Sequence, residues 1–168
     1  MSIELREVTL ANLREVDRLA VAPGQEGLVA PVGRSIAQAH LLAREQPHRQ
    51  VHHRAVYAGG VPVGFVLWEV QPAGSEFAGW FLGRLLIDAA HQRRGYGTQV
   101  LDALVTMLRS SSDQPKVLWT SYDPREDGAR GFYVRYGFIV TGQTIDDDEE
   151  VALLPHWPDG SPTDDPFA

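Results

Sequence analysis

The residues best suited to chemistry lie between positions 92 and 98, where two arginines and two glycines stand in one short segment. The segment reads Gln-Arg-Arg-Gly-Tyr-Gly-Thr, and a helical pattern of apolar residues follows it. Glycine lets a backbone approach a ligand closely, and the first turn of a helix has amide N–H groups without partners. The arginine guanidinium group matches phosphate oxygens. The segment therefore predicts a phosphate or pyrophosphate site.

Two well-known phosphate-binding motifs do not fit this segment. The dinucleotide fingerprint needs a third glycine where position 100 holds Val, and most of the chain precedes the strand that leads into the segment. A Walker loop needs the run Gly-Lys-Ser/Thr, which the sequence lacks. A glycine turn that only begins a surface helix is the structural alternative.

The composition limits the other chemistries. The chain has 168 residues, 43% of them hydrophobic, which suits one ordinary domain with its own core. It contains no cysteine, which excludes disulfides, cysteine nucleophiles and thiolate metal sites. His52 and His53 are adjacent in a predicted strand and point to opposite faces, and no histidine pattern matches a known metal motif. We therefore expect no metal site.

The formal net charge is −7, and the excess of acid lies at the C-terminal end. Residues 146–168 hold eight acidic residues and no Lys or Arg, whereas residues 1–145 are nearly neutral. A net acidic chain is a poor general binder of nucleic acid. No apolar run approaches the roughly 20 residues of a membrane span, and the first residues do not resemble a signal peptide. We expect a cytoplasmic protein that binds neither nucleic acid nor membrane.

The remaining pattern predicts the elements that must position the 92–98 segment. Alternating apolar residues predict strands, and apolar residues three and four apart predict helices. The predicted strands cover 3–8, 51–58, 61–70, 79–88, 116–122, 138–141 and 150–154, and the predicted helices cover 10–19, 36–44, about 98–109 and 128–136. Ser35 is the expected N-cap of the second helix. The order predicts one α/β (α+β) domain over residues 1–155, and residues 156–168, with three prolines, predict a loose acidic tail.

Two blocks of the sequence resemble one known family. Residues 92–97 match Gln/Arg-x-x-Gly-x-Gly/Ala, and residues 129–138 resemble Ala-x-x-Leu-Tyr-x-x-x-Gly-Phe. Both are signatures of the GNAT superfamily of acyl-CoA-dependent N-acetyltransferases, and the order of elements over about 3–155 agrees. The resemblance implies a central, mixed, mostly antiparallel sheet of about seven strands. It also implies a splay between the fourth and fifth strands and about four flanking helices.

The resemblance implies that acetyl-CoA binds as co-substrate in this splay. Its pantetheine amides would pair with the strand edge at Leu86, Ile87 and Asp88. Its pyrophosphate would lie on the segment formed by Gln92, Arg93, Arg94, Gly95, Tyr96, Gly97 and Thr98, with Arg93, Arg94 and Arg130 as phosphate partners. Many family members carry Asn three residues before the second block, where this chain has Glu126. No ligand role is assigned to Glu126.

The resemblance also implies direct attack of a neutral amine on the thioester. Tyr133 matches the family tyrosine that serves as general acid toward the leaving thiolate, and a phenol with a pKa of about 10 is protonated at neutral pH. A core aromatic residue is the alternative for Tyr133. Glu26 and Glu69 are the candidates for a general base or for acceptor contacts, and each is alternatively a surface carboxylate.

The acceptor amine is the least defined part of the prediction. Residues 25–31, 35–39 and 80–88 resemble segments of bacterial diamine and spermidine/spermine acetyltransferases, which favours a polyamine or diamine. Glu26, Glu69, Glu76 and the acidic run 146–150 would attract such a polycation. Another small amine, an amino acid or a protein amine stays open, as does an acetyl-CoA-binding module without efficient transfer. By analogy with the family, the protein is a possible homodimer.

Overall fold

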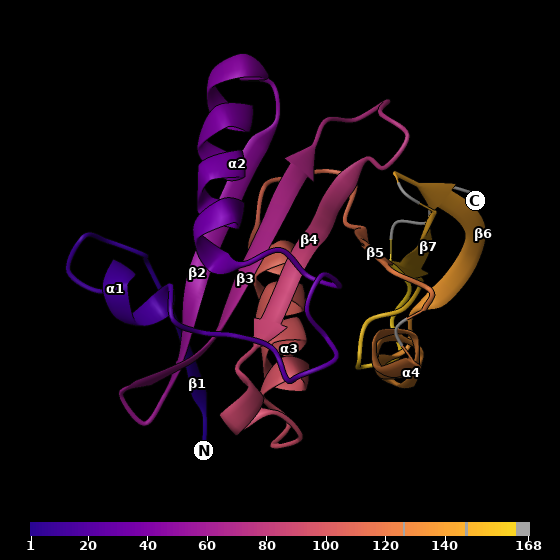
Figure 1. Cartoon of the computed structure of the whole chain (residues 1–168). Coiled ribbons are helices and arrows are strands. Elements are labelled where there is room, and N and C mark those ends of the chain that lie inside the picture. Colours follow the sequence, from indigo (N-terminus) through magenta and orange to yellow (C-terminus); the bar gives the residue numbers. More distant parts are fainter. Residues whose placement is uncertain (126, 147, 164–168) are drawn as a thin grey trace.

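One mixed sheet forms the centre of the computed structural model (Figure 1), which describes residues 1–125, 127–146 and 148–163. Within these residues its seven strands are β1 (Ile3–Arg6), β2 (Gln50–Ala58), β3 (Val61–Gln71), β4 (Gly79–Ile87), β5 (Leu118–Tyr122), β6 (Ile139–Ile145) and β7 (Glu149–Leu154). Their order is β1-β2-β3-β4-β5-β7-β6. The β4–β5 pair is parallel and the other pairs are antiparallel. The predicted mixed, mostly antiparallel sheet is confirmed.

Helices cover both faces of the sheet. The described residues form α1 (Leu13–Val16), α2 (Val32–Glu45), α3 (Tyr96–Ser110), α4 (Asp127–Tyr136) and a 3-10 turn, η1 (Ala89–His91). Side chains of α3 and α4 share one core cluster with the sheet, and side chains of α1 and α2 share another. The predicted layering, with helices on both faces of the sheet, is therefore confirmed.

The apolar stripe of α3 fixes the position of the glycine segment. Its buried residues are Val100, Leu101, Leu104, Val105 and Leu108, each at most 3% exposed. Complete burial of such a side chain contributes about 1.5–3 kcal/mol each. The stripe holds α3 against the sheet, and the N-terminus of α3 therefore lies where β4 ends.

Two predicted helices differ from the structure. The helix predicted over 10–19 covers only Leu13–Val16, because the Thr9 N–H donates to Asn12 Oδ1 at 2.7 Å and the chain turns there. The second helix begins at Val32 rather than at residue 36, directly after Pro31, whose fixed φ suits the start of a helix. Ser35 is therefore not the N-cap; it lies inside α2, and its hydroxyl donates to the Pro31 carbonyl at 3.0 Å.

Residues 156–163 also differ from the loose tail that the sequence predicted for 156–168. Trp157 is 6% exposed and belongs to the same core cluster as α3. The Thr163 N–H donates to the Pro155 carbonyl at 3.1 Å, and Arg109 of α3 pairs with Asp159 at 2.7 Å. The large apolar surface of the Trp157 ring explains this packing, because burial of an aromatic side chain removes about 150–250 Å² from water. Residues 164–168 lie outside the described residues.

His53 makes the stability of the domain depend on pH. Its ring stacks on Phe65 at 5.8 Å between centroids, and its Nδ1 is buried with no hydrogen-bond partner among the described residues. Burial lowers the pKa of His53, and the nearby Arg54 and His52 add to this effect. The unfolded chain therefore binds more protons than the folded chain below about pH 6.5. The free energy of unfolding should fall as pH drops below that value.

Replacing His53 by Phe tests this effect. His53→Phe keeps the stacking on Phe65 and removes the group that must stay neutral. We expect the melting temperature of the variant to fall less than that of the wild type between pH 7.5 and about pH 5.5. Parallel melting curves for the two proteins over this range would contradict the assignment.

Candidate active site

The strands β4 and β5 separate at the centre of the sheet. They pair only at Trp80 with Leu118, Phe81 with Trp119 and Leu82 with Thr120. Beyond these pairs β4 continues to Ile87, and its other edge stays paired with β3 up to the pair of Gly64 with Ile87. Within the described part of the chain, the edge of β4 that faces β5 therefore has no strand partner from Gly83 onward. Buried backbone groups require partners, so this edge is suited to an extended polar ligand.

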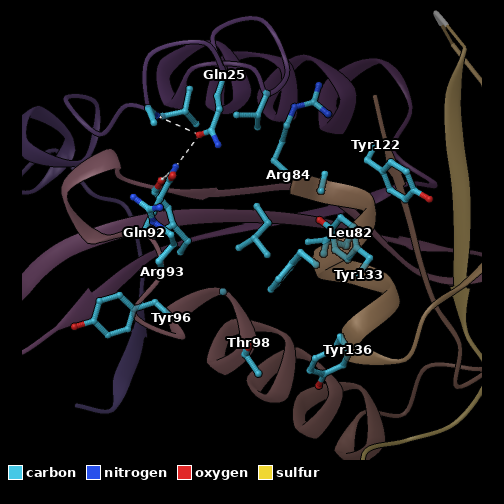
Figure 2. Close-up of a pocket in the computed structure, with 18 of the residues that line it drawn as sticks. Gln25, Leu82, Arg84, Gln92, Arg93, Tyr96, Thr98, Tyr122, Tyr133 and Tyr136 are labelled. Atoms are coloured by element: carbon cyan, nitrogen blue, oxygen red, sulfur yellow. Dashed lines mark hydrogen bonds between the residues drawn. The ribbon is translucent and has the colours of Figure 1, made fainter. Parts of the chain in front are cut away.

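A cavity of about 900 Å³ occupies the separation between the two strands (Figure 2). Its walls come from the loop after α1, from β4, from the segment after η1, from β5 and from α4. The lining residues include Val21, Gln25, Val29, Leu82, Gly83, Arg84, Leu85, Ile87, Gln92, Arg93, Gly95, Tyr96, Gly97, Thr98, Ser121, Tyr122, Phe132, Tyr133, Arg135 and Tyr136. The cavity is of the size that holds a small-molecule ligand.

The glycine segment forms one end of this cavity. Gly95 precedes α3 with φ +79°, in the left-handed region that favours glycine, and none of the described side chains caps the helix there. The first amide N–H groups of this 15-residue helix therefore have no partner within it. A Cβ at Gly97 would lie 3.0 Å from Phe132 Cζ of α4. Glycine at 97 thus lets α3 and α4 approach each other beside the predicted anion site.

A hydrogen-bonded link joins this end of the cavity to the loop after α1. Gln92 Nε2 donates to Gln25 Oε1 at 2.8 Å and to the Ile87 carbonyl at 3.0 Å (Figure 2). Gln25 Oε1 also accepts from the Ala22 N–H at 3.2 Å. We call this contact the Gln25–Gln92 link; it connects two walls of the cavity that are 67 positions apart in sequence.

A model of the acetyltransferase (GNAT) family matches residues 30–138, which is more than half of the chain. The chain belongs to the GNAT family. The family resemblance predicted from residues 92–97 and 129–138 is therefore confirmed, and the chain is an acetyltransferase. No curated protein sequence matches it.

Solved structures share the GNAT fold with this chain. Thermoplasma acidophilum PaiA N-acetyltransferase, solved with coenzyme A, is 15% identical with a TM-score of 0.63, covering 91% of this chain and 98% of that one. AAC(6')-Ib, solved with paromomycin and acetyl-CoA, is 20% identical with a TM-score of 0.67, covering 91% and 92%. Arabidopsis thaliana Naa50, solved with a bisubstrate analogue, is 17% identical with a TM-score of 0.60, covering 91% and 97%.

The structure brings most of the predicted cofactor residues of this GNAT chain to the cavity. Eight of them line it: Ile87, Gln92, Arg93, Gly95, Tyr96, Gly97, Thr98 and Tyr133. Tyr96 and Tyr133 are both buried. Arg94 is exposed and does not line it.

Two predicted cofactor residues have other partners, and a third, Leu86, could take the predicted role only through its backbone. The Leu86 side chain is 3% exposed in the core beneath α1 and α2, whereas its backbone belongs to the β4 edge past the last pair with β5. Asp88 begins η1, its N–H donates to the Val63 carbonyl at 2.9 Å, and its carboxylate accepts from the Ala20 and Ala90 N–H groups at 3.1 Å. Arg130 lies 3.5 Å from the Glu150 carboxylate of β7. Glu126 lies outside the described residues.

The two predicted base candidates do not line the cavity. Glu26 accepts from the Gly24 N–H at 2.6 Å within its own loop. Glu69 pairs with Arg49, whose Nε lies 2.8 Å away. Among the residues described around the cavity, none is Asp or Glu. Two carboxylates contact side chains that line the cavity: Glu149 accepts from the Ser121 hydroxyl at 2.6 Å, and Asp102 accepts from the Tyr136 hydroxyl at 2.8 Å.

Tyr133 lies in an aromatic group at the wall formed by α4. Its ring stacks on Tyr122 at 5.7 Å and meets Phe132 and Phe138 edge to face. Tyr133 shares a core cluster with Leu82, the last residue of β4 that pairs with β5, and both line the cavity. Burial, together with the Glu150 carboxylate, raises the pKa of the neighbouring Tyr122 to about 12. Tyr122 therefore stays neutral and adds no charge to this aromatic group.

Sequence reasoning missed several polar residues of the cavity, among them Arg84, Ser121 and Arg135. Arg84 stands within the apolar run of β4, and Arg135 stands within the helical pattern of α4. Both patterns indicate packing, so neither arginine was recognised as a cavity residue. Comparing alternate positions along β4 could have identified Arg84, because it is a charged residue among the apolar residues of that strand. The role of Ser121 depends on where β5 leaves β4, which no local pattern encodes.

No group of three His, Asp or Glu side chains among the described residues could hold a metal ion. In the same part of the chain, every helix is too short or too polar to cross a membrane.

Proposed function

We propose that this GNAT chain transfers the acetyl group of acetyl-CoA to the primary amine of a small acceptor. The observation that supports this most strongly is the continuity of the cavity. It runs from the uncapped N-terminus of α3, along the unpaired edge of β4, to Arg84 of β4 and Ser121 of β5, and the loop after α1 forms one of its walls. One end suits a pyrophosphate, the middle suits an extended amide chain, and the other end leaves room for an acceptor.

The residues present fit acetyl-CoA. The amides of Tyr96, Gly97 and Thr98 would receive the pyrophosphate, with Arg93 and Arg135 adding positive charge at that wall. The pantetheine amides would pair with the β4 edge near Ile87. Asp88 is not part of this proposal, because its N–H and its carboxylate already have partners.

The chemistry requires an acid and a base. The acceptor nitrogen attacks the thioester carbon, the C–S bond breaks, and the departing sulfur gains a proton while the nitrogen loses one. We assign the acid to the Tyr133 hydroxyl. For the base we propose Glu149, which the Ser121 hydroxyl links to the cavity, in place of Glu26 and Glu69.

The proposal has several versions, which differ in the class of acceptor amine. A polyamine or diamine is the version that the sequence resemblance favours, and Glu149, from the acidic run 146–150, is the carboxylate that supports it. Asp147 of that run lies outside the described residues. Paromomycin and a peptide-like bisubstrate analogue, bound by the neighbours AAC(6')-Ib and Naa50, make aminoglycosides and protein N-termini acceptors to test. A homodimer is a separate prediction that analytical ultracentrifugation tests.

Release of free thiol from acetyl-CoA tests the proposed function. The chain has no cysteine, so a thiol reagent reports only released CoA. The amine panel contains spermine, spermidine, diamines, amino acids, aminoglycosides and a lysine peptide. Saturable release with at least one amine is expected. Failure of acetyl-CoA to bind would contradict the proposal, whereas tight binding without any turnover would favour a binding module.

Arg93→Gln provides a test of the cofactor end of the cavity. Loss of an exposed charge that faces a phosphate should raise the KM for acetyl-CoA by roughly 3- to 10-fold and leave kcat nearly unchanged. Arg44→Gln is the matched control, because Arg44 is an exposed arginine of α2 outside the cavity. An equal KM in the two variants would argue against a phosphate at Arg93.

A further inference from the structure

Arg84 occupies the acceptor end of the cavity. It lies in β4 two residues after Leu82, where pairing with β5 stops. Side chains alternate along a strand, and Leu86 belongs to the core beneath α1 and α2, so Arg84 lies on that same face of the sheet. Figure 2 shows Arg84 beneath α2, away from Gln92, Arg93 and Tyr96 at the other end of the cavity. This position separates Arg84 from the predicted phosphate site.

The guanidinium of Arg84 has incomplete partners. Its Nη1 donates to the Gly83 carbonyl at 2.6 Å, and its Nη2 reaches Gln38 Oε1 of α2 at 3.4 Å. Its Nε is buried and has no hydrogen-bond partner among the described residues. No carboxylate of the described residues forms an ion pair with it. Leaving a charged donor buried and unpaired is unfavourable, and an anion from a ligand would satisfy it.

The opposite wall of this end carries the complementary charge. Ser121 lies on β5, one residue past the last β4–β5 pair, and its hydroxyl contacts the Glu149 carboxylate at 2.6 Å. Ser121 shares its face with Trp119, which packs with Phe81 on the side of the sheet away from α3. A cation on β4 and a carboxylate behind β5 thus flank the acceptor end. This pattern complements a ligand that carries both an amine and a carboxylate.

We propose that Arg84 binds a carboxylate of the acceptor, so that this enzyme acetylates an amino acid or another small amine bearing a carboxylate. The inference rests on the proposed acetyl transfer and narrows its acceptor class. Arg84 also works against a pure polycation, because a polyamine would bring like charge to an arginine that lacks an acidic partner. A guanidinium matches a carboxylate in shape and charge, so Arg84 is a specificity residue for the acceptor.

Matched pairs of amines test the inference. Cadaverine is lysine without its carboxylate, and putrescine is ornithine without its carboxylate. We expect the wild-type kcat/KM, measured by thiol release, to be about 10- to 100-fold higher for the amino acid of each pair, the range for hydrogen bonds to charged groups. In Arg84→Gln this preference should disappear, while the KM for acetyl-CoA stays the same. Arg84→Lys should recover part of it, and Arg44→Gln should keep all of it.

Each outcome decides the inference. Equal or better turnover of cadaverine and putrescine by the wild type overturns it, as does an Arg84→Gln variant that loses the same factor on both members of a pair. Absence of turnover with every amine would instead count against the proposed function. In that case calorimetric titration of lysine and cadaverine into CoA-saturated protein still decides: tighter lysine binding that Arg84→Gln abolishes supports the inference, and its absence rejects it.

Discussion

Tyr133→Phe is expected to lower kcat by about 100- to 10,000-fold, the range for loss of a positioned general acid, while acetyl-CoA binds as before. The phenol ring is 7% exposed and packs against Tyr122, Phe132 and Phe138. Phenylalanine keeps this packing and removes only the hydroxyl at the cavity wall. Steady-state kinetics with the best amine of the panel, together with calorimetric titration of acetyl-CoA, measure the two effects separately.

Tyr136→Phe is the matched control for this experiment. Tyr136 also lines the cavity from α4, but its hydroxyl donates to Asp102 Oδ1 at 2.8 Å. Burial raises the pKa of Tyr136, and the hydrogen bond to Asp102 adds to this effect. The variant should lose about 1 kcal/mol of stability and keep kcat within a few-fold. Equal losses of kcat in the two variants, or a loss of acetyl-CoA affinity in Tyr133→Phe, would rule out the acid role.

Gly64→Ala is expected to lower the free energy of unfolding by roughly 2–4 kcal/mol. Gly64 of β3 pairs with Ile87 at the end of β4. A Cβ at this position would lie 2.5 Å from the Leu86 carbonyl oxygen and 2.8 Å from Ile87 Cδ1. The first contact is with backbone, so the two strands must move apart, and β4 is the strand that carries the cavity edge. Denaturant unfolding measures the loss, and the KM for acetyl-CoA should rise with it.

Gly33→Ala is the matched substitution with the opposite expectation. Gly33 lies in α2, and the nearest atom to its added Cβ is Asp17 Oδ1, the end of a flexible side chain, at 2.7 Å. Alanine is favoured over glycine inside a helix by about 1 kcal/mol. The variant should therefore be as stable as the wild type or more stable. If both substitutions changed stability equally, the close approach of β3 and β4 would not be the cause.

Local patterns were sufficient to predict most of the sheet and the segment at the start of α3. The hairpin of β2 and β3 follows from alternating apolar residues around Gly59 and Gly60, and the α3 stripe follows from its helical spacing. Gly95 could be assigned a special backbone role because its neighbours began a helix. These features depend on residues close in sequence.

Features that depend on distant partners could not be predicted in this way. Arg130 and Asp88 looked like cofactor residues by position in the family motif, yet their partners, Glu150 and Ala20, come from other parts of the chain. Trp157 looked like part of a loose tail because the surface it covers belongs to α3. For Glu69, the ion pair with Arg49 depends on the register of β2 and β3, which one sequence does not reveal.

The Gln25–Gln92 link has a consequence for how the two substrates are loaded. One side chain belongs to the wall where the nucleotide is expected and the other to the wall where the amine is expected, so the two binding equilibria share a contact. Thermodynamic reciprocity then requires that any factor by which CoA changes amine affinity equals the factor by which the amine changes CoA affinity. We expect this cooperativity to shrink in Gln25→Ala. We also expect saturation with CoA to slow hydrogen exchange in the loop after α1.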